Sequence, residues 1–385
     1  MKKKSSCSAE IVGSIDELLT QILERVPALS LIRSKCVSKQ WLSLISDPDF
    51  HRRHTFQNPN PKILAFLSPE TNQDQKHRPV YVVNPTTNQF RALFPPTLRD
   101  DVTRSTLVRY ALAFDPSQSP HYKVLCVTND DDDGGHHDIE IYSSETGEWK
   151  HLKTPYFPRE RAMHFGWRSR LGAVYCNGAV HWLRSRHEAG LRFGLYGGNG
   201  IMGFRREKKT GVLHYFEISQ ERFLVVSAIP PVPSVVKNIP LKGNEPTTWP
   251  NLAQRYFGVC GGRLYLIETY DHCLTQFDVM EMEKDYSGWF VKYQVDLNPL
   301  VAAFPGQDCN VFVVLCLFQE EETDYGVEDT STHLLLHLSG KVISYNLRSK
   351  TFRTSVELVN KELALGNHLY LEDVVFPYME TLTCL

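Results

Sequence analysis

The chain has 385 residues, of which 42% are hydrophobic, and its formal net charge is −2. This length suffices for two or three domains, or for one large β domain with a small module attached. A charge so close to zero gives no overall basic field of the kind that attracts nucleic acid or a membrane surface, so neither is expected as a partner.

The cysteines and the apolar segments indicate a protein of the cytoplasm and/or the nucleus. Nine cysteines are scattered along the chain without a Cys-x-x-Cys pair, which is typical of buried thiols in a reducing compartment. The first residues lack the apolar core of a signal peptide, and the longest apolar run, Val311–Phe318, is too short to span a bilayer. We therefore expect a soluble intracellular protein with a disordered terminus over residues 1–12.

Residues 13–56 have the apolar spacing of short helices. In the first helix, expected over Ile15–Val26, apolar residues recur every three or four positions, as on one face of a helix. Ser14 and Glu17 can cap its first turn reciprocally, and Pro27 cannot continue it. Two further helices are expected, one after a cap at Ser30 and one starting at Ser38 and ending at Asp47 and Pro48.

A module of three short helices is at the lower size limit for burying an adequate core alone. Some of its apolar surface must therefore be covered. The spacing leaves two alternatives open, since the helices can pack on the chain's own β domain or dock onto another protein.

The stretch Ser14–Phe50 resembles the F-box of plant F-box proteins, and it departs from that pattern at Ser14, Ile15 and Gln21. It matches the pattern at Asp16, Leu18, Leu19, Ile22, Leu23, Arg25, Pro27, Ser30, Leu31, Arg33, Lys35, Val37, Lys39, Trp41, Leu44, Ile45, Asp47, Pro48 and Phe50. The resemblance implies docking on a Skp adaptor subunit and, through it, on the cullin scaffold. The adaptor-binding residues would be Ile15, Leu18, Leu19, Ile22, Leu23, Pro27, Leu31, Val37 and Trp41.

After a short linker at residues 57–61, strand-like runs replace the helical spacing, so residues 62–385 are expected to form a β domain. Four segments leave a strand and re-enter one seven positions later with an aromatic residue, and a fifth, looser copy runs from Phe277 to Trp289. The exit and re-entry positions are Val83 and Phe90, Tyr142 and Trp149, Phe216 and Phe223, and Tyr345 and Phe352. These repeats predict β-hairpins in which one aromatic ring per repeat packs between neighbouring sheets.

Repeated hairpins predict an all-β propeller-like domain of about six blades; the structural alternative is a β-sandwich. The region also resembles the F-box-associated β-propeller domain of the same plant family, in the stretches HYKVLCV, IEIYSSETGEWKHL, LGAVYCNGAVHWL and YFGVCGGRLYLIE. Because propellers commonly close their ring with a terminal strand, we expect Leu369–Phe376, or the segment just after it, to pair with the first blade near Lys62–Leu67.

Two stretches have residues suited to ligands, and each has a simpler interpretation. Gly198, Gly200 and Gly203 form a Gly-x-Gly-x-x-Gly pattern without the surrounding strand and helix of a nucleotide site, so a loop is expected. Asp130–Asp133 with His136 and His137 could ligate a metal, but a solvated loop between strands is favoured. No Gly-x-Ser-x-Gly, His-Glu-x-x-His or P-loop motif occurs, so we expect no catalytic residue, cofactor or metal.

Together the two resemblances imply a non-catalytic substrate-recognition subunit of a Skp-cullin-F-box ubiquitin ligase, in which the β domain holds a target protein. Candidate target-binding residues are Trp167, Arg168, Arg170 and Trp249, because Trp and Arg dominate interface hot spots. Either Trp could instead be a core residue of a blade. The alternative function is a propeller enzyme or glycan-binding lectin whose helical extension packs on its own domain.

Overall fold

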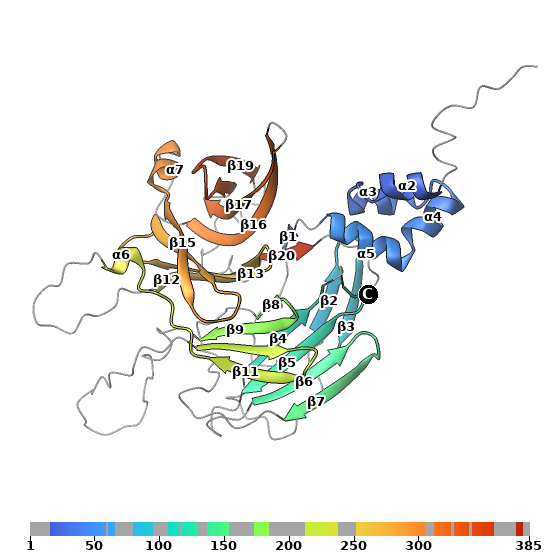
Figure 1. The fold of residues 1–385 in the computed structure, drawn as a ribbon, viewed down its shortest axis with the longest axis horizontal. Helices are drawn as coiled ribbons and strands as arrows, with labels where there is room; N and C mark the ends of the chain where they lie inside the picture. Colours follow the sequence, from blue (N-terminus) through green and yellow to red (C-terminus); the bar gives the residue numbers. More distant parts are fainter. Residues whose placement is uncertain are drawn as a thin grey trace, which may run out of the picture.

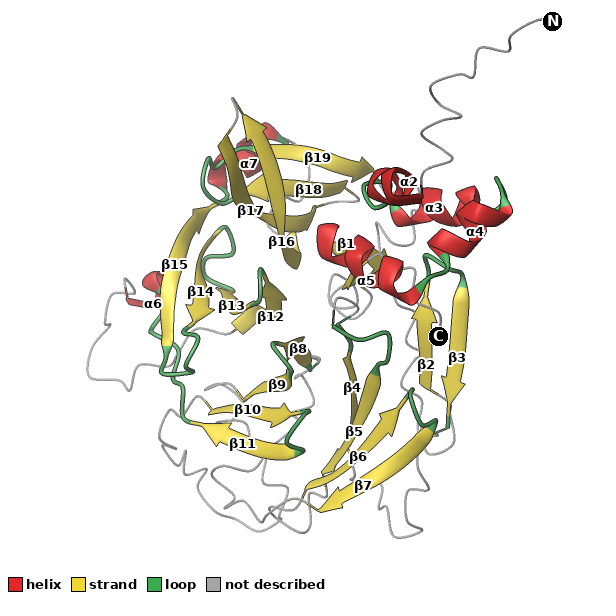
Figure 2. Cartoon of the chain, turned by 45° about the vertical axis from the view of Figure 1, so that its right-hand side comes forward, coloured by secondary structure: helices red, strands yellow, loops and turns green. Residues whose placement is uncertain are grey.

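The computed structural model describes residues 16–58, 61–65, 80–94, 107–115, 118–129, 137–153, 173–184, 212–237, 252–304, 312–324, 327–338, 341–357 and 375–379. In this part of the chain, a group of short helices is followed by antiparallel sheets arranged around a ring (Figure 1, Figure 2). The fold is therefore a helical module followed by a β-propeller-like domain. None of the described helices has the length and apolar character needed to cross a membrane.

Within residues 16–58 the structure describes four helices, and the sequence predicted three; the four are α2 (Asp16–Leu23), α3 (Ala28–Ser34), α4 (Lys39–Ile45) and α5 (Pro48–Gln57). Ser38 caps α4 as expected, since its hydroxyl accepts a hydrogen bond from the Trp41 amide at 3.1 Å. Asp47 and Pro48 begin α5 instead of ending the module. The Asp47 carboxylate accepts from two backbone amides of the first turn, and proline fits the first helical position because that position needs no N–H.

Four sheets have four strands each, and in every one the strands are neighbours in chain order. Their strands are β4 (Leu107–Ala113), β5 (Lys123–Asn129), β6 (His137–Ser143) and β7 (Glu148–Lys153); β8 (Val174–Cys176), β9 (Ala179–Arg184), β10 (Val212–Glu217) and β11 (Arg222–Val226); β12 (Leu252–Cys260), β13 (Arg263–Tyr270), β14 (Gln276–Met282) and β15 (Trp289–Asp296); and β16 (Phe312–Asp324), β17 (Val327–Leu338), β18 (Lys341–Asn346) and β19 (Phe352–Glu357). Two short helices, α6 (Ser234–Lys237) and α7 (Asn298–Ala303), lie between these sheets in the chain.

The described residues thus form four blades, and the prediction of about six is wrong. Two further sheets have only two strands each, β2 (Val80–Asn84) with β3 (Gln89–Leu93) and β1 (Pro61–Ala65) with β20 (Val375–Met379). The prediction divided the length of the β domain by the usual size of a blade. Length is a poor measure here because residues 185–211 are inserted between β9 and β10 of a single blade.

The strand pairing confirms the four closely matched hairpins. In each of them the exit residue lies directly opposite the predicted aromatic: Val83 and Phe90, Tyr142 and Trp149, Phe216 and Phe223, and Tyr345 and Phe352. The looser fifth copy also forms a hairpin, β14 with β15, but in another register, since Phe277 lies opposite Val295 and Trp289 opposite Met282. The repeat is therefore the outer hairpin of its sheet.

The four close copies share one turn geometry, which explains their constant length. The fifth residue after each exit position has a positive φ, namely Asn88 at 54°, Gly147 at 75°, Glu221 at 49° and Lys350 at 58°. A left-handed residue at this point returns the chain into the second strand, and glycine and asparagine adopt that conformation most readily. In two of the turns an asparagine side chain, Asn84 or Asn346, also accepts hydrogen bonds from two backbone amides of the loop.

The expectation that one ring per repeat packs between sheets is correct for only part of the set. Of the four re-entry rings, Phe223 is buried in a cluster between sheets, and Trp149 is partly buried against another such cluster. Phe90 is 70% exposed and Phe352 36% exposed. These two residues belong to the first and last outer hairpins of the chain.

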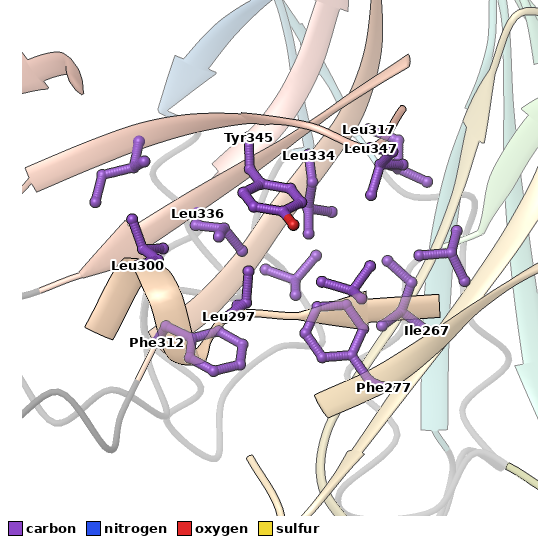
Figure 3. Close-up of a cluster of buried hydrophobic side chains, with 14 of the residues drawn as sticks. Ile267, Phe277, Leu297, Leu300, Phe312, Leu317, Leu334, Leu336, Tyr345 and Leu347 are labelled. Carbon is purple, nitrogen blue, oxygen red and sulfur yellow. The ribbon is translucent and has the colours of Figure 1, made fainter. Parts of the chain in front are cut away.

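The cores of the propeller lie between successive blades, as the face-to-face packing of twisted sheets requires. The largest cluster joins the sheet β12–β15 to the sheet β16–β19, and Figure 3 shows its side chains converging from both. Its residues include Ile267, Phe277, Leu334, Leu336 and Tyr345, all at most 4% exposed. Separate clusters join β4–β7 to β8–β11, β8–β11 to β12–β15, and β2–β3 to β4–β7.

A buried histidine joins two of the blades. His181 on β9 accepts a hydrogen bond at Nε2 from the Tyr286 hydroxyl at 2.8 Å, while Nδ1 contacts the Val174 carbonyl at 3.3 Å. A carbonyl can only accept, so Nδ1 carries the proton and the ring is neutral. Tyr286 belongs to the turn between β14 and β15 and stacks on Tyr215 of the neighbouring blade. Burial lowers the pKa of His181 to about 4.

This histidine should make the propeller less stable in mild acid. In the unfolded chain, histidine titrates at its ordinary pKa of 6.5, so between pH 6.5 and about 4 only the unfolded state takes up the proton. Stability should therefore fall as the pH decreases through this range, by about 2 kcal/mol between about pH 7.5 and pH 5. Denaturant unfolding of the native chain and of His181→Gln at both pH values measures the difference; equal pH dependence in the two proteins would contradict it.

The two ends of the described β domain pair with each other, which confirms the predicted closing strand. β20 runs antiparallel to β1, with Lys62 opposite Tyr378 and Leu64 opposite Phe376. Neither β1 nor β20 pairs with a strand of the four-stranded sheets, so each is the other's hydrogen-bonded neighbour in the described structure. The closing pair, β1 with β20, thus fixes the end of the ring next to the helical module.

Candidate docking surface and target-binding residues

The helical module has a complete small core of its own. Six residues at most 3% exposed form it: Leu19, Leu23, Ala28, Leu31, Ile45 and Phe50. Val26, Ile32, Trp41 and Leu44 pack against this core and are partly buried. Because all of these residues belong to α2, α3, α4, α5 or the segment joining α2 to α3, the module does not need the propeller to bury its central side chains.

Polar contacts fix α5 against the end of α2. The buried Glu24 carboxylate, 7% exposed, pairs with Arg53 at 2.5 Å and accepts from Gln57 at 3.3 Å. Asn58 donates to the Glu24 carbonyl at 2.8 Å, and the His54 ring lies 2.8 Å from the Val26 carbonyl. These contacts hold α5 in place up to the point where the chain leaves for β1.

Several large apolar side chains of the module remain in solvent. Leu18 and Ile22 on α2 are 41% and 49% exposed, and they lie one helical turn apart on the same face. Leu29, Val37, Leu42 and Phe56 are 45% to 77% exposed. Exposed apolar residues gathered on so small a unit are typical of a surface that another protein covers. We call Leu18, Ile22, Leu29, Val37 and Leu42 the docking surface.

The nine predicted adaptor-binding residues fall into distinct groups in the structure. Leu18, Ile22, Val37 and Pro27 are exposed, and Trp41 is half-buried. Leu19, Leu23 and Leu31 belong to the core, so they can only support the surface. Ile15 lies outside the described residues.

The sequence prediction omitted three exposed residues, Leu29, Leu42 and Phe56. Leu29 directly follows the buried Ala28 on α3, and Leu42 follows the half-buried Trp41 on α4. Adjacent residues on a helix point in different directions, so when both are apolar they cannot both face the core. Such pairs in the sequence could have shown that α3 and α4 each expose an apolar side chain. Phe56 lies on α5, a helix that the prediction did not include.

The predicted target-binding residues Trp167, Arg168, Arg170 and Trp249 lie outside the described residues, as do the glycine pattern at Gly198–Gly203 and the acidic loop at Asp130–Asp133 with His136. Of the cysteines in the described part of the chain, Cys126, Cys176, Cys260 and Cys316 are buried free thiols, as expected. Cys36 is exposed and Cys273 is partly exposed, so the expectation of burial does not extend to them.

Comparison with known families and proteins gives matches in the same order along the chain. Residues 16–53 match the F-box domain, and residues 70–241 match the F-box associated beta propeller domain. F-box protein At5g07610 of Arabidopsis thaliana is 28% identical, over 98% of this chain and 94% of its own length. Putative F-box protein At5g15660 of the same plant is 26% identical over 46% of this chain and 48% of its own length. Putative F-box protein At3g52320 is 48% identical over 16% of this chain and 15% of its own length.

The helical module is therefore an F-box, and residues 70–241, which contain β2 to β11, belong to an F-box-associated β-propeller domain. The chain belongs to the F-box proteins that combine these two domains, and it is similar over nearly its whole length to a member from Arabidopsis. This confirms the resemblance found in the sequence.

Proposed function

We propose that this chain is the substrate-recognition subunit of a Skp-cullin-F-box ubiquitin ligase. The F-box binds the Skp adaptor and, through it, the cullin, and the propeller binds a target protein. Within this proposal Trp167, Arg168, Arg170 and Trp249 remain candidate contacts to the target. Six free cysteines among the described residues support a reducing cytoplasmic or nuclear location.

The observation that carries the proposal is the docking surface on a module that already has its own core. Leu18, Ile22 and Val37 are 41%, 49% and 61% exposed, although Leu19, Leu23 and Leu31 beneath them are at most 3% exposed. Burial of an apolar side chain contributes about 1.5 to 3 kcal/mol. A partner that covers several of these residues at once would therefore gain substantial binding free energy.

The proposed subunit acts by proximity and breaks no bond itself. A target held on the propeller has a high effective concentration near the ubiquitin-charged enzyme that the cullin brings. The rate of modification then depends on which target lysines reach that enzyme. The residues of this chain contribute the two binding surfaces.

The test is co-expression of the full chain with a Skp adaptor and measurement of co-purification. Leu18→Asp with Ile22→Asp should reduce recovery of the adaptor by at least about 100-fold, because two carboxylates would be desolvated against an apolar partner. Both residues are exposed, so the variant should still fold. Leu19→Asp would not be informative, because Leu19 is 3% exposed and a charge there would disrupt the core.

Ile229→Asp is the matched control, because Ile229 is an exposed apolar residue, 52% exposed, outside the F-box. It should co-purify with the adaptor as the native chain does. Circular dichroism should show the same helix and strand content in all three proteins. Unchanged adaptor recovery with the α2 variant, or no recovery with the native chain, would refute the docking proposal.

A further inference from the structure

A polar cavity of about 280 Å³ opens on the last blade, on the face of the sheet β16–β19 that points away from the largest core cluster. Each of the four strands contributes to it. Its lining is Glu320, His333, Ser344, Asn346, Thr351, Phe352 and Arg353. The volume is close to that of one large side chain and small for a cofactor, since sites for small molecules occupy about 300 to 1,000 Å³.

The floor of the cavity is a buried network of polar groups centred on His333, whose side chain is 8% exposed. Its Nδ1 lies 3.0 Å from the Ser344 hydroxyl, and its Nε2 lies 2.7 Å from the Ser331 hydroxyl and 3.3 Å from the Asn346 amide nitrogen. The same Nε2 lies 3.6 Å from an oxygen of the Glu320 carboxylate. Phe318 stacks on the ring from the neighbouring strand, with the centroids 5.3 Å apart.

The rim of the cavity combines one acid and one base. Arg353 Nη2 lies 2.5 Å and 2.6 Å from the two Glu320 carboxylate oxygens. Arg353 is 61% exposed and Glu320 34% exposed, so this ion pair is solvated and contributes little to stability. Phe352 also borders the cavity, but it lies opposite Tyr345, and its ring packs 6.2 Å from that of Phe304 on the core-facing side of the sheet.

The surroundings of the cavity are acidic. Glu320 lies in the outer half of the hairpin β16–β17, opposite Ser331, and the strands of this hairpin are the longest in the described part of the chain and extend away from the ring (Figure 1). From Gln319 to Thr332 this hairpin has six acidic residues and no lysine or arginine: Glu320, Glu321, Glu322, Asp324, Glu328 and Asp329. Such a local charge attracts cations and repels anions at low and physiological salt.

We propose that this cavity binds a lysine or arginine side chain from a basic, extended segment of the target protein. The incoming cation takes the place of Arg353 on the Glu320 carboxylate and donates hydrogen bonds to its two oxygens. Arg353 then acts as an internal substitute that keeps Glu320 paired while the cavity is empty. This proposal rests on the proposed function, because it gives the propeller's target a chemical class.

An acidic or phosphorylated segment fits the same residues less well. An anion would have to approach Arg353 past Glu320 and beside the acidic hairpin, and Arg353 is already neutralised by the same carboxylate. The two alternatives predict opposite effects of removing Arg353. If a cation binds, loss of Arg353 leaves the Glu320 carboxylate available and should strengthen binding. If an anion binds, the same loss removes the only arginine that lines the cavity and should weaken binding.

The test is the affinity of the full chain, in complex with its adaptor, for a fluorescein-labelled peptide of alternating arginine and serine, followed by fluorescence polarisation. Glu320→Gln should weaken binding by at least about tenfold, and Arg353→Ala should strengthen it about threefold or more. Added salt should weaken binding to the native chain more than to Glu320→Gln. The matched controls are Glu217→Gln and Arg222→Ala, which alter a similar solvated pair, 3.1 Å apart, on another blade; both should bind the peptide normally.

Three results would overturn the proposal. They are no binding of the arginine peptide by the native chain, equal binding by Glu320→Gln, and tighter binding of a glutamate–serine peptide that Arg353→Ala abolishes. Co-purification of each variant with the adaptor is measured in parallel. Retained adaptor binding without peptide binding refutes the basic-target proposal alone, whereas loss of adaptor binding by the native chain refutes the ligase proposal.

Discussion

Removal of residues 366–385 should open the ring and make the propeller sensitive to proteases or insoluble. Residues 1–60 of the truncated chain should still bind the adaptor. The deletion takes away β20, so β1 loses its only strand partner in the described structure. An unpaired strand edge is a site of aggregation and local opening. Each 1.4 kcal/mol of lost stability raises the open population tenfold, so limited proteolysis should be at least about tenfold faster.

A deletion of residues 1–12 is the control for chain shortening, because it leaves both closing strands in place. The register offers a second, independent measurement. Leu64 lies opposite Phe376, so a disulfide between Leu64→Cys and Phe376→Cys should form on oxidation and be detected by mass spectrometry. A truncated chain that melts and resists protease like the native one would show that the closing pair does not maintain the ring.

Glu268→Ala should destabilise the propeller by about 3 to 5 kcal/mol. Glu268 and Arg255 lie opposite each other on β13 and β12, and their side chains are 1% and 6% exposed. The Arg255 Nε donates to the carboxylate at 3.0 Å, and the Tyr270 hydroxyl donates to its other oxygen at 2.8 Å. Removing the carboxylate takes away the negative charge that compensates a buried guanidinium, which is the costly way to break such a pair.

The appropriate control replaces both charges. Arg255→Leu with Glu268→Leu should be much closer to native stability than Glu268→Ala, because no charge is then left buried. Tyr270→Phe should cost only about 1.5 to 3 kcal/mol, the range for a hydrogen bond to a charged group. Thermal and urea unfolding of the four proteins give the comparison; a Glu268→Ala protein within 1 kcal/mol of native would mean that water reaches the pair.

The features predicted well are those that depend on residues close together in the chain. The hairpin from Val83 to Phe90 was predictable because its turn, its length and both ends lie within eight residues, and a left-handed residue at Asn88 fits that length. The closing pair could be predicted because a ring needs its two ends to meet. The number of blades depends on which distant hairpins share a sheet, and insertions such as residues 185–211 hide this in the sequence.

The candidate sites were less predictable because burial is decided by neighbours from elsewhere in the chain. Leu18 and Leu19 belong to the same apolar stripe, yet one is 41% exposed and the other 3%. Which of them faces the core depends on how α4 and α5 cover α2. The cavity residues come from four strands between Glu320 and Arg353, so no local motif marks them. The only sequence signal is a histidine, His333, directly before the apolar residues Leu334, Leu335 and Leu336 in β17.

The connection between the F-box and the propeller limits how far the two can separate. α5 ends at Gln57 and β1 begins at Pro61, so only Asn58, Pro59 and Asn60 stand between them, and Asn58 is hydrogen-bonded to the end of α2. Three residues span at most about 10 Å, and proline removes part of the remaining rotational freedom. Under the proposed function, a protein bound to the propeller therefore has a short tether to the module that has the docking surface. The shape of the assembly would then select which lysines are modified, with little contribution from a long flexible connection.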